Sequence, residues 1–199
     1  MIYIGLIAYA VYQALPAQKN NPRLQTISWW VVLGGLANCA WIFLWHYEQY
    51  VATLGAMLIL LATLIVVYLR LGSGLIKVPP GETWTVRVPF SIYLGWITVA
   101  TVANVTDVLD YLKWNGFGIA PETWVLIMLG AVFIIATLMS LTRRDVAYAL
   151  VVVWALVGIA VKYADVSLVA TAARWTAAFV AITLALGMFL AKPKVEQLA

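Results

Sequence analysis

Charged residues are scarce in this chain of 199 residues, where Asp, Glu, Lys and Arg together make up 10% of the sequence. Hydrophobic residues make up 65% of it. An average soluble domain is about 25% charged and about 45–50% apolar. The composition therefore excludes an ordinary soluble domain and indicates an integral membrane protein with several spans.

Cysteine and histidine occur once each, as Cys39 and His46. A single cysteine excludes an internal disulfide and a thiolate metal cluster, and a zinc or di-iron site needs three or four converging ligands. We expect His46 to be an interfacial residue beside a polar turn, although a single axial ligand there stays open. The basic residues are dispersed, which gives no support for nucleic-acid binding.

Catalytic groups are missing as well. The sequence has no Ser/His/Asp set, glycine-rich phosphate loop or buried carboxylate pair. Its carboxylates gather in the connections, where a role in membrane topology fits them better than general acid–base catalysis. We therefore predict that the protein is not an enzyme and holds no metal.

Seven apolar segments are present, separated by connections with turn-forming asparagine, glycine and proline. Six of them approach the ~20 residues that cross a bilayer, whereas the first is short, as if the chain began inside a helix. The segments are residues 2–15, 26–47, 51–71, 88–108, 123–141, 146–163 and 168–190. We predict an all-α fold, a polytopic bundle of about seven transmembrane helices.

Positive charge alternates in register with these segments. Basic residues gather in the first, third and fifth connections and in the C-terminal tail, whereas acidic residues gather in the second, fourth and sixth connections. By the positive-inside rule the C-terminus is cytoplasmic and Met1 lies on the far side. We expect a multi-pass protein of a bacterial inner membrane, in contact with the lipid bilayer.

Two cationic residues, Lys162 and Arg174, are candidates for other functions. Lys162 lies near the end of the sixth segment, where it can snorkel to the interface, whereas a retinal Schiff base needs a lysine in the middle of the last helix. Arg174 lies about two turns inside the last segment, where an unpaired charge is costly. For Arg174 two interpretations stay open, an anion contact and a snorkelling arginine.

Two segments combine large aromatic side chains with amides, which must find partners inside a membrane. Their spacing places the residues of each segment on related helix faces. Flat side chains beside a few polar groups suit a planar or sterol-like ligand. The predicted ligand-binding residues are Asn38, Trp41 and Trp45 in the second segment and Tyr93, Trp96 and Asn104 in the fourth.

At these residues the chain resembles the TspO/translocator family, the tryptophan-rich sensory proteins also called peripheral benzodiazepine receptors. The fifth helix of that family carries Pro-Tyr-x-x-Trp-x-x-x-Ala-x-x-x-Asn. The residues that match it in register are Tyr93, Trp96, Ala100 and Asn104, and Ile92 replaces the proline.

A second motif supports the resemblance. The third helix of the family carries Asn-x-x-Trp followed by two phenylalanines, and Asn38 and Trp41 match its first part. Trp45 and His46 stand where the phenylalanine pair would be. Tyr3 is a candidate for the tyrosine that ends the family's Trp-x-x-Leu-Tyr motif.

The resemblance covers residues 1–113 and implies a helical bundle that binds porphyrins, haem or sterols, often as a dimer. The family's first helix and its Trp-x-Pro-Pro connection are missing here. We predict a TspO-like core at residues 1–113 and three additional transmembrane helices at residues 114–199.

The function that we predict is a membrane binding or sensory protein for a tetrapyrrole, such as a porphyrin or haem, or for a sterol-like molecule. Two alternatives remain open. One is an accessory subunit of a larger membrane complex, which could bind pigment, and the other is a small solute transporter.

Overall fold

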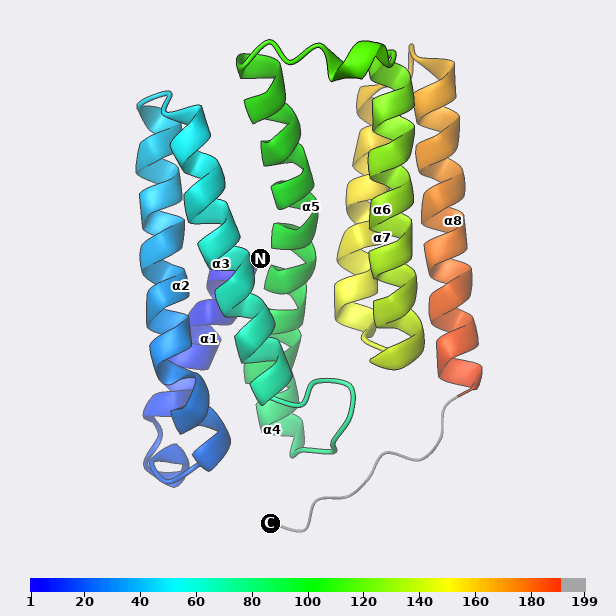
Figure 1. Ribbon diagram of the computed structural model, residues 1–199. Coiled ribbons are helices and arrows are strands. Elements are labelled where there is room, and N and C mark those ends of the chain that lie inside the picture. The colour runs from blue at the N-terminus through cyan, green and yellow to red at the C-terminus, as the bar shows by residue number, and fades with distance from the viewer. Residues whose placement is uncertain (191–199) are drawn as a thin grey trace. The chain divides into compact units, whose positions relative to one another are not determined.

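A computed structural model describes residues 1–190, and the regular elements in that range are helices (Figure 1). The all-α class predicted from the sequence is confirmed. The longer helices are α1 (Ile2–Ala14), α2 (Pro22–His46), α3 (Tyr50–Arg70), α5 (Val88–Tyr111), α6 (Pro121–Thr142), α7 (Val146–Lys162) and α8 (Ser167–Phe189). The short ones are η1 (Pro16–Gln18), α4 (Pro80–Glu82), the π-helical turn η2 (Thr83–Arg87) and η3 (Gly116–Gly118).

Within residues 1–190, five helices are long and apolar enough to cross a membrane: α2, α3, the continuous stretch from α4 to α5, α6 and α8. The apolar helices α1 and α7 have 13 and 17 residues. At 1.5 Å per residue they rise about 20 and about 26 Å, which is less than the ~30 Å of a hydrocarbon core. The seven predicted segments are thus five long candidate spans and two shorter apolar helices.

Helix starts follow the capping chemistry of the sequence. The side chain of Asn21 accepts a hydrogen bond from the backbone N–H of Arg23 at 3.1 Å, and Pro22 takes the first helical position of α2. Asp145 caps α7 in the same way, accepting from the N–H of Tyr148 at 3.1 Å. Because of the Asn21 cap, α2 begins four residues earlier than the apolar pattern predicted.

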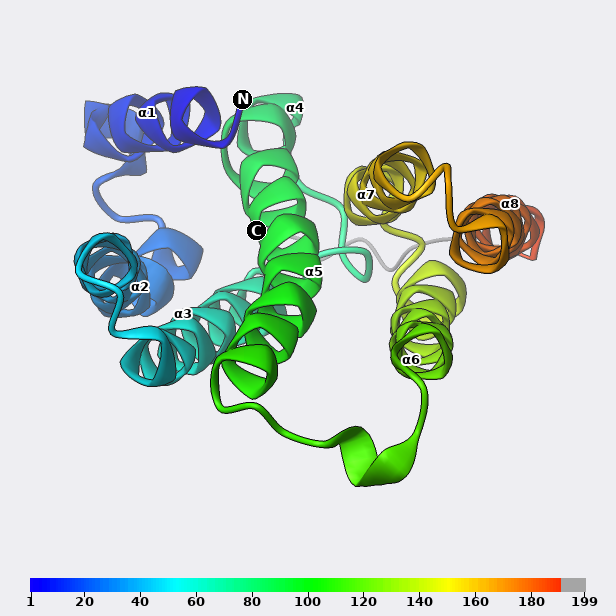
Figure 2. The same cartoon turned by 90° about the horizontal axis from the view of Figure 1, so that it is seen from above.

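The chain divides into two compact units between Val108 and Leu109. In the first unit α2 and α3 form an antiparallel pair and α5 lies beside α3, while α1 is inclined to them (Figures 1 and 2). In the second unit α6, α7 and α8 lie side by side, and α8 contacts both of the others.

Both units bury bulky and small side chains between their helices. In the first unit, α3 buries bulky side chains such as Met57, Leu60 and Leu64. In the second unit, α8 turns small residues inward, including Ala173 and Ala177. Small residues let helix backbones approach closely within a membrane.

Candidate functional site

The first unit contains a cavity of about 190 Å³ with a mostly apolar lining. Helices α1, α2, α3 and α5 each contribute to its wall. The lining residues are Ile2 and Tyr3 from α1; Asn38, Trp41 and Ile42 from α2; Met57 from α3; and Tyr93, Trp96, Ile97 and Ala100 from α5.

Four of the six residues predicted to bind ligand line this cavity: Asn38, Trp41, Tyr93 and Trp96. A spacing of three residues within each pair puts them on one face of α2 and one face of α5. The two faces lie far apart in the sequence, and the fold brings them to a single cavity.

Trp41 contributes a polar group to this wall, one of seven buried side-chain atoms without a hydrogen-bond partner among the described residues. Its ring stacks on Trp45 with ring centroids 5.4 Å apart and planes at 26°, and Trp45 in turn meets Tyr50 edge-on. The indole Nε1 of Trp41 is buried, and among the described residues it has no hydrogen-bond acceptor. Buried donors in native proteins nearly always have a partner, so this N–H requires an explanation.

The other polar groups of the cavity are partly engaged. The amide Nδ2 of Asn38 donates to the hydroxyl of Tyr3 at 3.5 Å, which is long for a hydrogen bond. Tyr3 is 62% exposed, whereas Tyr93 is only 8% exposed. Both amide and phenol groups therefore lie at the cavity, but only a weak contact ties Asn38 to α1.

Two predicted site residues lie behind the wall and do not line the cavity. Trp45 supports the ring of Trp41 from the side. Asn104 is buried, and its Nδ2 donates to the hydroxyl of Thr53 on α3 at 3.0 Å. The amide of Asn104 thus joins α5 to α3.

Sequence reasoning missed part of the wall. Met57 and Ile97 look like any other core residues of an apolar helix, so no pattern distinguishes them. It also missed an ion pair at the start of α2: Arg23 Nε to Glu82 Oε1 at 2.9 Å. The only signal was an isolated carboxylate, Glu82, just ahead of a long apolar run.

The remaining candidates lie elsewhere. His46 is exposed at the end of α2, and the described residues contain no cluster of three or more His, Cys, Asp or Glu that could hold a metal ion. Lys162 ends α7 beside the ring of Tyr163. Arg174 is exposed on α8.

Long apolar helices beside a cavity with aromatic lining define a multi-pass membrane protein. Comparison with protein-family models matches residues 1–190 to the TSPO-like protein family, and the chain belongs to that family. This confirms the resemblance seen at the two motifs. No curated protein and no solved structure matched the chain.

The family match runs through α6, α7 and α8 as well as the first unit. The division into a core at residues 1–113 and three additional helices at 114–199 stays a prediction.

Proposed function

We propose that the cavity of the first unit binds a flat apolar molecule, a tetrapyrrole such as a porphyrin or haem, or a sterol-like compound. The protein then acts as a membrane binding or sensory protein. The observation that carries this proposal is the buried, unpartnered N–H of Trp41 at the wall of an aromatic cavity.

The unpartnered N–H favours a ligand with an acceptor atom. Leaving a buried donor unsatisfied costs about 1–3 kcal/mol. A carboxylate, carbonyl or ring-nitrogen acceptor on a ligand in the cavity would remove that cost. Stacking and apolar burial against Trp41, Trp96 and Met57 would supply most of the affinity.

The six predicted residues take three roles in this proposal. Asn38, Trp41, Tyr93 and Trp96 contact the ligand. Trp45 holds the ring of Trp41 in place, and Asn104 holds α5 against α3.

The size of the cavity limits how a ligand enters. Pockets for drug-sized ligands are about 300–1,000 Å³, and this one is about 190 Å³. One ring system fits within that volume. A whole tetrapyrrole requires one wall to move, and the polar tie between α1 and α2 at the cavity is the long 3.5 Å contact of Tyr3 with Asn38.

The direct test is a titration of the purified protein with protoporphyrin while tryptophan fluorescence is followed. The double variant Trp41→Ala, Trp96→Ala should lose at least tenfold in affinity. The matched control is Trp29→Ala, Trp175→Ala, because these rings are 82% and 61% exposed and neither belongs to the cavity lining; its affinity should not change.

Quenching that is unchanged in the Trp41→Ala, Trp96→Ala variant would remove the proposal. A protein that binds neither protoporphyrin nor a sterol probe, but co-purifies with stoichiometric partners, would favour the accessory-subunit alternative.

A further inference from the structure

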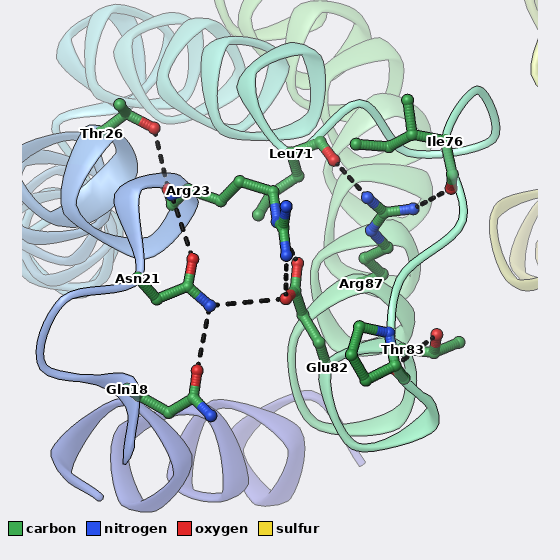
Figure 3. A network of polar contacts seen from close by, with 10 residues as sticks. Gln18, Asn21, Arg23, Thr26, Leu71, Ile76, Glu82, Thr83 and Arg87 are labelled. Carbon is green, nitrogen blue, oxygen red and sulfur yellow. Dashed lines mark hydrogen bonds and ion pairs between the residues drawn. The ribbon is translucent and has the colours of Figure 1, made fainter. Parts of the chain in front are cut away.

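A polar cluster fastens the connection between α1 and α2 to α4 (Figure 3). Glu82 is 1% exposed, and both of its carboxylate oxygens accept hydrogen bonds from Arg23. The Nε of Arg23 donates to Oε1 at 2.9 Å, and its Nη2 donates to Oε2 at 3.0 Å. Asn21 adds a donor to Oε2 at 3.5 Å and binds Gln18 at 2.9 Å. A bidentate charged pair of this kind fixes orientation as well as distance.

The same chain segment that carries Glu82 also supports α1. Gly5 of α1 lies so close to Pro89 that a Cβ at that glycine would be 2.9 Å from the Pro89 Cβ. Tyr9 meets Phe90 edge-on with ring centroids 5.0 Å apart. Helix α1 therefore rests on the stretch from α4 to the start of α5, and its closest packing there is with η2.

The support beneath α1 is a π-helical turn, η2. Such turns insert an extra residue and shift the faces that follow. Arg87, at the end of this turn, donates to the carbonyl oxygens of Leu71 at 2.7 Å and Ile76 at 2.6 Å. The turn is thus held firmly to the end of α3, and α1 lies on a fixed base.

The other end of α1 forms part of the cavity wall through Ile2 and Tyr3. Its polar tie at that end is the 3.5 Å contact between Asn38 and Tyr3. The ion pair lies at the other end of this base, whereas Ile2 and Tyr3 lie within one helical turn of Gly5, which packs on Pro89.

From this arrangement we infer that Glu82 and Arg23 are positioning residues for the cavity. Their ion pair fixes the angle at which α1 leaves its base, and so decides whether Ile2 and Tyr3 close the wall. Loss of the pair lets α1 swing away and speeds the entry and release of the ligand. This inference rests on the proposed function, because it concerns the same cavity.

The first measurement needs no ligand. In a Cys39→Ser background, spin labels at Ile7→Cys on α1 and Val51→Cys on α3 report the distance between the two helices. Both positions are exposed, at 64% and 54%. The parent protein should give one narrow distance distribution, and Glu82→Gln should broaden it.

The second measurement is the release rate of bound protoporphyrin, which should rise at least fivefold in Glu82→Gln and in Arg23→Gln. Glu48→Gln is the control, because Glu48 is an exposed carboxylate in another connection; it should change neither measurement. Arg23→Lys keeps the positive charge but cannot form two parallel hydrogen bonds to the carboxylate, so its effect on both measurements should be intermediate. This variant replaces Glu82→Gln if Glu82→Gln does not fold.

The charge-exchanged pair Arg23→Glu, Glu82→Arg should narrow the distance distribution again. If the distance distribution of the charge-exchanged variant is as broad as those of the single variants, the effect comes from lost packing, and the inference is overturned. A narrow distribution and parental release rate in Glu82→Gln would overturn it too. If the parent protein binds neither protoporphyrin nor a sterol probe, the proposed function fails, while the distance measurement still decides the role of the ion pair.

Discussion

The indole of Trp41 stacks on Trp45, and its N–H lacks an acceptor. A single substitution can separate the contribution of the ring from that of the N–H. Trp41→Phe keeps a ring and removes the donor. We expect protoporphyrin affinity to fall about 2- to 10-fold, the value of one neutral hydrogen bond of about 0.5–1.5 kcal/mol. Thermal stability without ligand should not fall, because no native hydrogen bond is lost. Equal affinity in the parent and Trp41→Phe would show that the N–H makes no contact with the ligand.

Asn104 should behave differently from the cavity residues, although the sequence grouped it with them. Its amide bridges to Thr53 at 3.0 Å and lies outside the cavity lining. Asn104→Ala should therefore reduce stability by about 1–3 kcal/mol, the cost of a broken buried hydrogen bond. Protoporphyrin affinity should stay within twofold of the parent value.

Thermal unfolding in detergent and the same fluorescence titration measure the two effects of Asn104→Ala. Thr53→Val removes the partner hydroxyl and should repeat the stability loss without changing affinity. A large loss of affinity at unchanged stability would place Asn104 in contact with the ligand.

At the scale of helices, α6 and α8 approach each other closely at Gly187. A Cβ at Gly187 would overlap the backbone carbonyl oxygen of Ser140, and a backbone atom cannot rotate out of the way. Gly187→Ala should push the two helices apart and cost about 1–3 kcal/mol, as overpacking does.

The matched control for Gly187→Ala is Gly130→Ala on α6, where a Cβ would have no neighbour within 4 Å. Since alanine favours helix more than glycine by about 1 kcal/mol, this control should be neutral or stabilising. Thermal unfolding of both variants decides the point: equal melting temperatures would contradict the close approach.

Helix existence was predictable, but some details of the helices were not. The predicted apolar segments agree with α3, α6, α7 and α8 to within a few residues, because an apolar run of span length in a membrane must satisfy its backbone internally. The π-helical turn η2 left no comparable pattern, since it packs against α1 and its last residue, Arg87, donates to the carbonyl oxygens of Leu71 and Ile76.

For the whole molecule, the number of helices that cross the bilayer depends on whether α7 crosses, because α7 is short. The alternation of basic and acidic connections predicts that α7 crosses. Thr142 and Asp165, both exposed residues that flank α7, should then lie on opposite sides. We expect Thr142→Cys to be labelled from the cytoplasm and Asp165→Cys from the opposite side.

A membrane-impermeant thiol reagent applied to intact and opened cells, in a Cys39→Ser background, measures this. Leu75→Cys and Phe117→Cys calibrate the two sides, because these exposed residues lie at opposite ends of the long stretch from α4 to α5. Labelling of Thr142→Cys and Asp165→Cys from the same side would mean that α7 does not cross.

The sequence by itself determined the membrane class, the order of the helices and the family, because scarcity of charge, apolar run length and two short motifs are local properties of the chain. It also grouped Asn38 with Trp41 and Tyr93 with Trp96, four residues that line the cavity, since helical periodicity places each pair on one face. Which amide faces the cavity and which joins two helices was decided only by the tertiary structure. Asn38 and Asn104 have the same chemistry, and only the neighbour that the fold brings to each one, a cavity for Asn38 and Thr53 for Asn104, sets their roles.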